Sequence, residues 1–405
     1  MERPTTSRRA VLGVAAGSVA LTGLAACSNG SKDSPGQAAS SAPAGPPLAI
    51  IAPAADSTGL PVSAEIEAKA EGGELTSVKL VDDKGGEVKG EFRLDKSSWV
   101  PSDPLEYKTT YTATVVATGT NGVTSTQTAT FTTMASPGKR KGAVLWNGDD
   151  VVYGVGMPVI VQFKDNYTID KDNRAGVEKR LFVKSEPHQK GAWRWVSGAV
   201  LEFRPEKYWE PGTKIEVRVG WGGHPLGDGD YGATDITAKY SIDDTAREMI
   251  VDNKKKTMVA MENGEEKKTA PVSLGKPSKP SFYGTMVIME KLRKTVFDSS
   301  TYGVPVDSPD GYKTDIEFAQ RMTWDGQFIH SAPWSVGDQG KRNVSHGCIN
   351  VSRPNAEWFF EWANVGDPIQ VLNTEEGVTE GNGWTCWNMS WEEFLKGSAL
   401  PPPTV

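Results

Sequence analysis

The chain has 405 residues, 38% of them hydrophobic, and a formal net charge of −7 at neutral pH. At roughly 100–200 residues per domain, this length predicts about two to four domains, and the apolar content is sufficient for folded cores. The net negative charge argues against a general nucleic-acid binder, because Lys and Arg must neutralise the phosphates of such a partner.

Residues 1–27 have the pattern of a secretory signal peptide. Arg8 and Arg9 precede an apolar stretch that runs from about residue 10 to residue 26 and is interrupted by glycines, which favours a targeting segment over a helix of the mature fold. The stretch ends in Leu24-Ala25-Ala26-Cys27, which resembles the lipobox of bacterial lipoproteins. This resemblance implies cleavage before Cys27 and lipidation of its thiol.

Export by the Sec and the twin-arginine routes both remain open, because Ser7-Arg8-Arg9 is similar to a twin-arginine signal. An ordinary signal peptide with a chance cysteine is the alternative to lipidation. The predicted location is outside the cytoplasm, anchored to the cell membrane by lipid and facing the cell wall. Residues 28–46 are mostly Ser, Ala, Gly and Pro and predict a flexible linker between the anchor and the folded domains.

Residues 47–136 and 137–243 each predict a small antiparallel β-sandwich. Short runs such as Tyr111–Val116 and Lys214–Val219 alternate with period two and are separated by turn residues. The two segments match at a constant offset, with Pro101, Leu105, Thr109, Tyr111, Ala113 and Val115 corresponding to Pro205, Trp209, Thr213, Ile215, Val217 and Val219. Such a repeat predicts two tandem immunoglobulin-like domains.

Residues 244–373 predict a third, mainly β domain. Asn263-Gly264 stands between two strand-like runs and is a strong hairpin signal. One notable helix is predicted near the end, with Pro354 in its first turn and its last apolar residue at Trp362. Residues 374–405 are rich in Trp and predict a C-terminal extension that packs on this domain. The predicted fold class is therefore mainly β, with two sandwiches followed by a third domain.

Cys348 and Cys386 are the two cysteines that remain besides Cys27. A disulfide between them is one interpretation for an exported protein. The other is a catalytic thiol, which needs a positioned base because a free thiol is only slightly ionised at neutral pH. Of four histidines in the chain, His330 and His346 lie near Cys348 in sequence. Two neighbouring strands joined by a long loop would bring His330 within hydrogen-bond reach of Cys348, which favours a nucleophile.

Gly347 precedes this cysteine and leaves room for a substrate to approach. The main-chain N–H groups of Gly347 and Cys348 could form an oxyanion hole, in which hydrogen bonds stabilise the charge on a tetrahedral intermediate.

His330 followed by Ser345-His346-Gly347-Cys348-Ile349-Asn350 resembles the signature of the L,D-transpeptidases, which cross-link peptidoglycan. The similarity extends over residues 298–305, 311–315 and 330–337, and it also covers the two sandwich segments and the tail. It is greatest to the lipoprotein forms of mycobacteria and related actinobacteria. The resemblance implies an L,D-transpeptidase catalytic domain over residues 244–373.

The resemblance also implies a role for each matching residue. Cys348 would be the nucleophile and His330 its base, with the carbonyl of Ser331 orienting the imidazole. His346 would line the site, and a second acid–base role for it stays open. Substrate-binding roles are implied for Tyr312 as a lid residue and for Ala332, Trp334, Ser345 and Asn350. Phe297 stands where similar members often carry Met under the lid, which affects the shape of the pocket and not the chemistry.

The implied reaction has two steps and requires no cofactor or metal. Cys348 attacks the third stem residue of a tetrapeptide donor and releases D-Ala, and the side-chain amine of a neighbouring stem then forms a 3→3 cross-link. Expected partners are the donor and acceptor stem peptides, the membrane through the lipid anchor, and carbapenem inhibitors. A stem-peptide carboxypeptidase or endopeptidase with the same dyad is the alternative enzyme. A non-catalytic wall-binding lipoprotein is the remaining alternative, against which the intact His330, Cys348 and Tyr312 argue.

Overall fold

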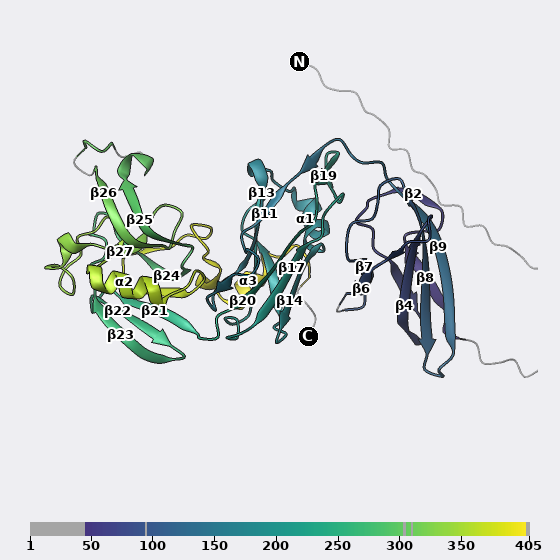
Figure 1. Cartoon of the computed structure of the whole chain (residues 1–405), viewed down its shortest axis with the longest axis horizontal. Coiled ribbons are helices and arrows are strands. Elements are labelled where there is room, and N and C mark those ends of the chain that lie inside the picture. The colour runs from purple at the N-terminus through teal and green to yellow at the C-terminus, as the bar shows by residue number, and fades with distance from the viewer. Residues whose placement is uncertain (1–44, 94, 303–304, 309–310, 402–405) are drawn as a thin grey trace, which may run out of the picture. The chain divides into compact units, whose positions relative to one another are not determined.

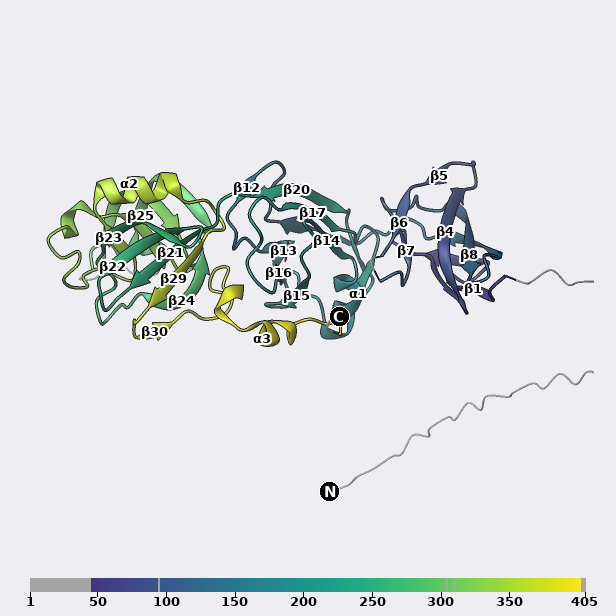
Figure 2. The ribbon, with the colours of Figure 1, turned by 90° about the horizontal axis from the view of Figure 1, so that it is seen from below.

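The computed structural model describes residues 45–93, 95–302, 305–308 and 311–401, and Figures 1 and 2 show the arrangement of their strands and helices. Strands predominate and the helices are few and short, which confirms the predicted fold class. The predicted signal peptide, Cys27 and nearly all of the predicted linker lie outside the described residues. Within the described ranges, no helix has both the length and the apolar character needed to cross a bilayer.

A five-stranded sheet with the order β2-β9-β8-β4-β5 dominates the first sandwich. Its strands are β2 (Ser57–Leu60), β4 (Gly73–Asp82), β5 (Glu87–Val88), β8 (Thr110–Gly119) and β9 (Thr124–Thr133). Two strand pairs accompany it, β1 (Leu48–Ala52) with β3 (Glu67–Ala70) and β6 (Gly90–Phe92) with β7 (Trp99–Pro101). The predicted alternation in β8 is confirmed, because Tyr111, Ala113 and Val115 are buried in one core.

Two four-stranded sheets, β11-β13-β16-β15 and β12-β20-β17-β14, form the second sandwich. The strands are β11 (Ala143–Leu145), β12 (Val152–Tyr153), β13 (Val159–Phe163), β14 (Leu181–Glu186), β15 (Gly191–Trp195), β16 (Val200–Pro205), β17 (Lys214–Val219) and β20 (Ile236–Ile242). The smaller elements are β10 (Arg140–Lys141), β18 (Pro225–Gly227), β19 (Asp230–Gly232), η1 (Lys164–Asn166) and α1 (Lys171–Glu178). The predicted repeat holds at its inward positions, because Trp209, Ile215, Val217 and Val219 are buried like their counterparts in the first sandwich.

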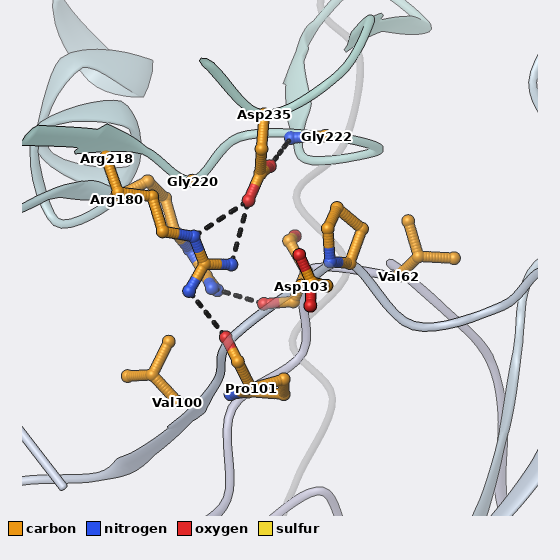
Figure 3. A pocket seen from close by; sticks show the side chains of 11 residues that line it. Val62, Val100, Pro101, Asp103, Arg180, Arg218, Gly220, Gly222 and Asp235 are labelled. Carbon is orange, nitrogen blue, oxygen red and sulfur yellow. Dashed lines mark hydrogen bonds and ion pairs between the residues drawn. The ribbon is translucent and has the colours of Figure 1, made fainter. Parts of the chain in front are cut away.

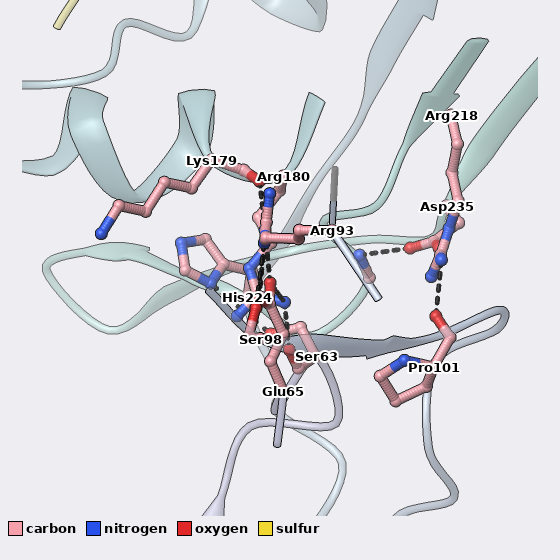
Figure 4. A network of polar contacts seen from close by, with 11 residues as sticks. Ser63, Glu65, Arg93, Ser98, Pro101, Lys179, Arg180, Arg218, His224 and Asp235 are labelled. Carbon is pink, nitrogen blue, oxygen red and sulfur yellow. Dashed lines mark hydrogen bonds and ion pairs between the residues drawn. The ribbon is translucent and has the colours of Figure 1, made fainter. Parts of the chain in front are cut away.

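Charged side chains join residues of the first and second sandwiches, as Figure 4 shows around Glu65. The Glu65 carboxylate accepts hydrogen bonds from Arg93 at 2.9 Å and from Ser98, and it pairs with Arg180 at 2.8 Å. Burial alone would raise the pKa of Glu65, but these groups together hold it below its usual range. The carboxylate therefore stays ionised and bridges cations from both sandwiches.

A second set of polar contacts between the two sandwiches lies beside the one around Glu65 (Figure 3). Arg218 pairs with Asp235 at 2.8 Å and donates to the carbonyl of Pro101 at 2.5 Å. The cavity between these groups has a volume of about 10 Å³, which is space for about one water molecule. This cavity lies between polar groups of the two sandwiches and is too small for a substrate.

The third domain contains a six-stranded sheet, β23-β22-β21-β29-β24-β30, and a four-stranded sheet, β25-β26-β27-β28. The six-stranded sheet is formed by β21 (Arg247–Asp252), β22 (Thr257–Glu262), β23 (Glu265–Pro271), β24 (Phe282–Val287), β29 (Pro368–Leu372) and β30 (Glu376–Gly377). The other contains β25 (Glu290–Asp298), β26 (Lys313–Arg321), β27 (Phe328–Ser331) and β28 (Ile349–Val351), with η2 (Ser299–Tyr302) and η3 (Pro333–Ser335) in the connections. Helix α2 (Arg353–Trp362) packs on β26 and β27 and buries Ala356 and Phe359 in the core.

Two local predictions for this domain are confirmed. The β22–β23 hairpin turns at Asn263 and Gly264, whose φ angles are 52° and 82°, the left-handed conformations that Asn-Gly favours. Helix α2 has Pro354 in its first turn and ends at Trp362. A proline is tolerated there because the first backbone N–H groups of a helix have no partner within it.

The C-terminal extension contacts the second sandwich as well as the third domain. Through β30 it pairs with β24 of the third domain. Farther along the extension, Glu380 pairs with Arg194 of the second sandwich at 2.6 Å. Phe394 of α3 (Trp391–Leu395) and Cys386 of η4 (Cys386–Asn388) then pack with Ala192. The sequence predicts only the first of these contacts, and the structure adds the second sandwich as a packing partner.

Candidate active site

The predicted histidine–cysteine pair lies at the junction of two neighbouring parallel strands. β27 and β28 pair with Ile329 opposite Ile349 and His330 opposite Asn350, and Cys348 immediately precedes β28. Residues 332–348 form the long connection between the strands, as predicted. Cys348 and His330 also share an aromatic neighbour, because Phe297 packs in one cluster with Cys348 and its ring centroid lies 5.2 Å from that of His330.

His330 is buried, and its orientation is set by one backbone contact. Its Nδ1 lies 2.9 Å from the carbonyl oxygen of Ser331. Since a carbonyl can only accept, Nδ1 carries the proton of the neutral ring and Nε2 keeps its lone pair. Burial lowers the pKa of His330 to about 4, and the hydrogen bond to Ser331 opposes this shift only in part. The imidazole is therefore a neutral base at physiological pH.

Cys348 is a partly buried free thiol whose Sγ donates to the carbonyl oxygen of Gly326 at 3.6 Å. Burial raises the pKa of Cys348 to about 12, because the apolar surroundings disfavour the thiolate. In the part of the chain that the structure describes, Sγ makes no hydrogen bond to His330. The pair in this state is thus a protonated thiol and a neutral imidazole.

The turn before Cys348, the predicted nucleophile, is tied together by Ser345. The Ser345 hydroxyl accepts from the N–H of Gly347 at 3.1 Å and donates to the carbonyl of Cys348 at 2.6 Å. Gly347 has φ of +122°, and a Cβ there would lie 3.1 Å from Nε2 of Gln327, so glycine suits this position. The Gly347 N–H, predicted for the oxyanion hole, is engaged by Ser345 in this state.

A segment 70 residues earlier in the chain supports this turn from behind. Ser281 donates its hydroxyl proton to the carbonyl of Gly347 at 2.6 Å, and Ser273 exchanges backbone hydrogen bonds with Asn350 at 2.9 and 3.1 Å. The N–H of Lys276 donates to the carbonyl of Ser345 at 2.9 Å. These hydrogen bonds fix the backbone of the turn on both sides of Cys348.

Aromatic side chains surround the pair. Trp334 is 60% exposed, and its ring centroid lies 6.1 Å from that of His330. Tyr312, the predicted lid residue, has its ring centroid 5.5 Å from that of His346, with the rings tilted by 36°, and its N–H donates a hydrogen bond to the hydroxyl of Ser299 at 2.9 Å. An exposed tryptophan beside the base is a surface on which a substrate can pack.

Three predicted substrate-binding residues are buried and serve the framework of the site in this state. Ala332 is fully buried, Asn350 is 3% exposed, and Ser345 is 6% exposed. Asn350 donates from Nδ2 to the hydroxyl of Ser335 at 3.3 Å, and Ser335 in turn donates to the carbonyl of Ala332 at 3.0 Å. The Asn350 side chain and the Ala332 carbonyl thus hold the η3 turn that carries Trp334, while Ser345 holds the turn before Cys348. A direct substrate contact by these three residues remains a prediction.

His346 points toward a lysine that the sequence does not single out. Nζ of Lys276 lies 3.1 Å from Nε2 of His346. The backbone carbonyl of Gly326 and the hydroxyl of Ser281 are further groups of the site that the sequence does not indicate, because all three lie in connections without a motif. Cys386 is free and buried, so the disulfide interpretation is wrong for the described state. Among the described residues, no group of three or more potential ligands is arranged to hold a metal ion.

Comparison with known proteins places the chain among described families and relatives. Residues 246–371 match the family model described as the L,D-transpeptidase catalytic domain, and residues 57–224 match the bacterial Ig domain. L,D-transpeptidase 2 of Mycobacterium tuberculosis is 37% identical over 342 residues, which cover 84% of this chain and 82% of that protein. L,D-transpeptidase 1 of the same species is 40% identical over 223 residues, covering 55% of this chain and 80% of that protein.

One similar solved structure is that of LD transpeptidase LdtMt1 in complex with imipenem. It is 36% identical, covers 57% of this chain and 99% of its own, and has a TM-score of 0.48. The long match to L,D-transpeptidase 2 and the catalytic-domain model over the third domain decide the assignment: this chain belongs to the L,D-transpeptidases.

Proposed function

We propose that the chain is a lipid-anchored transpeptidase that forms 3→3 cross-links between peptidoglycan stem peptides through a thioester on Cys348. The observation that carries this proposal is the buried His330, whose Nδ1 is held by the Ser331 carbonyl 2.9 Å away and whose ring shares the Phe297 side chain with Cys348. Such an arrangement provides a nucleophile, a base with its lone pair in place, and an orienting group.

In the first step, the Cys348 thiol leaves the Gly326 carbonyl and transfers its proton to Nε2 of His330 as Sγ bonds to the donor carbonyl carbon. Because burial raises the pKa of Cys348 to about 12 and lowers that of His330 to about 4, a free thiolate–imidazolium pair is unfavourable. Proton transfer therefore accompanies the attack. The imidazolium then returns the proton to the D-Ala nitrogen as the C–N bond breaks, which leaves the thioester.

In the second step, the side-chain amine of an acceptor stem attacks the thioester. His330 takes a proton from the amine, the C–S bond breaks, and the thiol regains that proton. Peptide bonds are formed without an external energy source because the bond broken in the donor is also an amide.

The negative charge on the tetrahedral intermediates needs hydrogen-bond donors. The N–H of Cys348 and the hydroxyl of Tyr312 are the proposed donors, in keeping with the lid role implied for Tyr312. The N–H of Gly347 could join them once Ser345 releases it, since Ser345 holds it at 3.1 Å in this state. Each donor of this kind typically contributes about a hundredfold or more to the rate.

The test of the reaction is incubation of the full chain with a disaccharide tetrapeptide, followed by mass spectrometry of the products. A dimer that has lost one D-Ala supports the proposal, and its fragmentation assigns the linkage between the third residues. Tripeptide without dimer would instead establish a carboxypeptidase. The Cys348→Ala variant serves as the control and should yield neither product.

Carbapenems are the proposed inhibitors, because LdtMt1 has been solved in complex with imipenem and is 36% identical to this chain. The Cys348 thiol would open the β-lactam ring and remain acylated. Intact-mass measurement should show one adduct on the wild-type chain and none on Cys348→Ala. A wild-type chain that folds and forms no adduct would contradict the proposal.

The lipid anchor is proposed from the sequence Leu24-Ala25-Ala26-Cys27. Cells that express the full chain and are fed a labelled fatty acid should incorporate label into the protein, and Cys27→Ala should remove the label and release the protein from the membrane fraction. Label retained in Cys27→Ala would contradict lipidation at this residue.

A further inference from the structure

The turn between β26 and β27, residues 322–327, lies against the sulfur of Cys348. Its Gly326 carbonyl accepts the hydrogen bond from Sγ at 3.6 Å. Within the turn, the Thr323 hydroxyl accepts from the N–H of Gln327 at 3.0 Å, and the Thr323 carbonyl accepts from the N–H of Gly326 at 3.4 Å. The position of the Gly326 carbonyl, and with it the position of the thiol in this state, therefore depends on how the turn is held.

Asn382 of the C-terminal extension holds the outer side of this turn. Its side-chain Oδ1 accepts hydrogen bonds from the backbone N–H groups of Trp324 at 3.1 Å and of Asp325 at 3.2 Å. These are the two residues directly before Gly326. An amide oxygen has two lone pairs, so one side chain can accept from both groups. The acceptor for this part of the turn thus comes from the extension and not from β26 or β27.

The next two residues of the extension fix Asn382 in this place. Gly383 is buried with φ of +99°, and a Cβ there would lie 2.6 Å from the carbonyl oxygen of Met322, so the extension approaches the turn as closely as only glycine allows. Trp384 is 4% exposed and packs in the core cluster of the second sandwich, with its ring centroid 6.3 Å from that of Trp146. The segment that holds the turn is therefore anchored on the second sandwich.

The same turn also supports the backbone before Cys348. Gln327 is its last residue, and its Nε2 donates to the carbonyl of Pro280 at 3.2 Å while its Oε1 accepts from the N–H of Phe282 at 3.0 Å. A Cβ on Gly347 would lie 3.1 Å from Nε2 of Gln327. A shift of the turn would therefore move groups on both sides of the thiol.

We propose that Asn382 is a positioning residue of the active site, which holds the turn of residues 322–327 so that the Gly326 carbonyl sets the position from which the Cys348 thiol attacks. Asn382 acts through the backbone of the turn and not on the reacting atoms. The inference rests on the proposed role of Cys348 as the nucleophile. It makes the docking of the C-terminal extension on the second sandwich a condition for full activity of the third domain.

The direct test is infrared spectroscopy of the S–H stretching band of Cys348, recorded on the full chain in detergent. The band is assigned by its loss in Cys348→Ala, and its frequency falls when the thiol donates a hydrogen bond. The wild-type band should lie at the lower frequency of a hydrogen-bonded thiol, and Asn382→Ala should shift it toward that of a free thiol because the turn is no longer held. A wild-type band at the frequency of a free thiol, or one that Asn382→Ala leaves unchanged, would overturn the proposal.

The second test is the rate of Cys348 acylation as a function of imipenem concentration. In Asn382→Ala the maximal rate constant should fall by about tenfold or less, the effect of one lost hydrogen-bonding side chain. The half-saturating concentration should stay unchanged, because the turn holds the thiol and does not bind the antibiotic. Gly383→Ala should have the same effect, since its Cβ would push the extension off the turn. Asn382→Asp should keep the wild-type band and rate, because a carboxylate oxygen also accepts from both N–H groups.

Asn388→Ala is the matched control. Asn388 is another asparagine of the extension, and its Oδ1 accepts from the backbone N–H of Thr285 in β24 at 3.2 Å, outside this turn. The variant should lose similar stability, measured as its melting temperature, and keep the wild-type band and rate. Equal losses of rate in Asn382→Ala and Asn388→Ala would show a purely structural role and overturn the proposal. The infrared band of the wild type needs neither a variant that folds nor turnover, so its outcome is separate from that of the cross-linking assay.

Discussion

The two free thiols, Cys348 and Cys386, allow the proposed nucleophile to be compared with a core residue. Burial raises the pKa of both, to about 12 for Cys348 and well above the usual value for Cys386. Acidity therefore does not separate them. Cys348 is partly exposed and shares an aromatic cluster with a base, whereas Cys386 is buried with Phe394 and Ala192 between the second sandwich and the tail. The two thiols therefore differ in solvent exposure and in the presence of a neighbouring histidine, and not in acidity.

Replacing the two cysteines should give opposite results, with the largest effect at Cys348. Cys348→Ala should reduce acylation by imipenem and dimer formation to background, a loss of roughly a thousandfold or more, because no other group can form the thioester. Its melting temperature should stay close to that of the wild type. Appreciable acylation of Cys348→Ala at Cys386 would show that access does not separate the two thiols.

Removing the base tests whether the neighbouring histidine makes the nucleophile. His330→Gln should lower the acylation rate by about a hundredfold to ten-thousandfold, because the thiol loses its proton acceptor. The control is His188→Gln, a change at an exposed histidine of the second sandwich, which should react at the wild-type rate. Stopped-flow fluorescence on mixing with imipenem measures both rates. Equal rates for the two variants would exclude His330 as the base.

The pH dependence of the acylation rate should reflect the pKa of the buried His330 and not that of a free histidine side chain. His330 acts as a base only when neutral, and burial lowers its pKa to about 4. The acylation rate should therefore stay level as the pH falls through about 6.5, the usual value for histidine, and decline only near pH 4. A half-maximal rate near pH 6.5 would indicate a solvated imidazole and contradict the buried geometry.

The smallest effect is expected at the core thiol. Cys386→Ala should leave acylation unchanged and lower the free energy of unfolding by about 1–2 kcal/mol, because it opens a small cavity in a well-packed cluster. Chemical denaturation with equal slopes for both proteins would measure the difference. A loss of acylation in folded Cys386→Ala would mean that the cluster supports the site through the tail.

Much of the fold and the centre of the site can be predicted from the sequence because their signals are local. The alternation in β8 and β17, the Asn263-Gly264 turn and the Pro354 helix each depend on a few adjacent residues. His330 and Cys348 lie within one short stretch, and the long connection between them is typical of neighbouring parallel strands.

The supporting groups could not be predicted in the same way. Ser281 and Lys276 act on Gly347 and His346 from about 70 residues away, in a connection whose composition indicates only a turn. The engagement of the Gly347 N–H by Ser345 depends on a φ angle of +122°, which a glycine permits but does not impose. To predict that the C-terminal extension packs on the second sandwich, one must know which faces of that sandwich other elements leave uncovered.

Burial of the Cys348 thiol, which also donates to the Gly326 carbonyl, keeps it protonated, and we expect this to prolong the life of the enzyme between substrates. Peroxide and other oxidants attack thiolates far faster than thiols, and sulfinic and sulfonic acids at such a sulfur are not readily reversed. An idle nucleophile that remains protonated therefore resists this damage in the oxidising surroundings where we propose the protein works. In the proposed mechanism, its reactivity is released when a bound donor draws the sulfur away from Gly326 and toward His330.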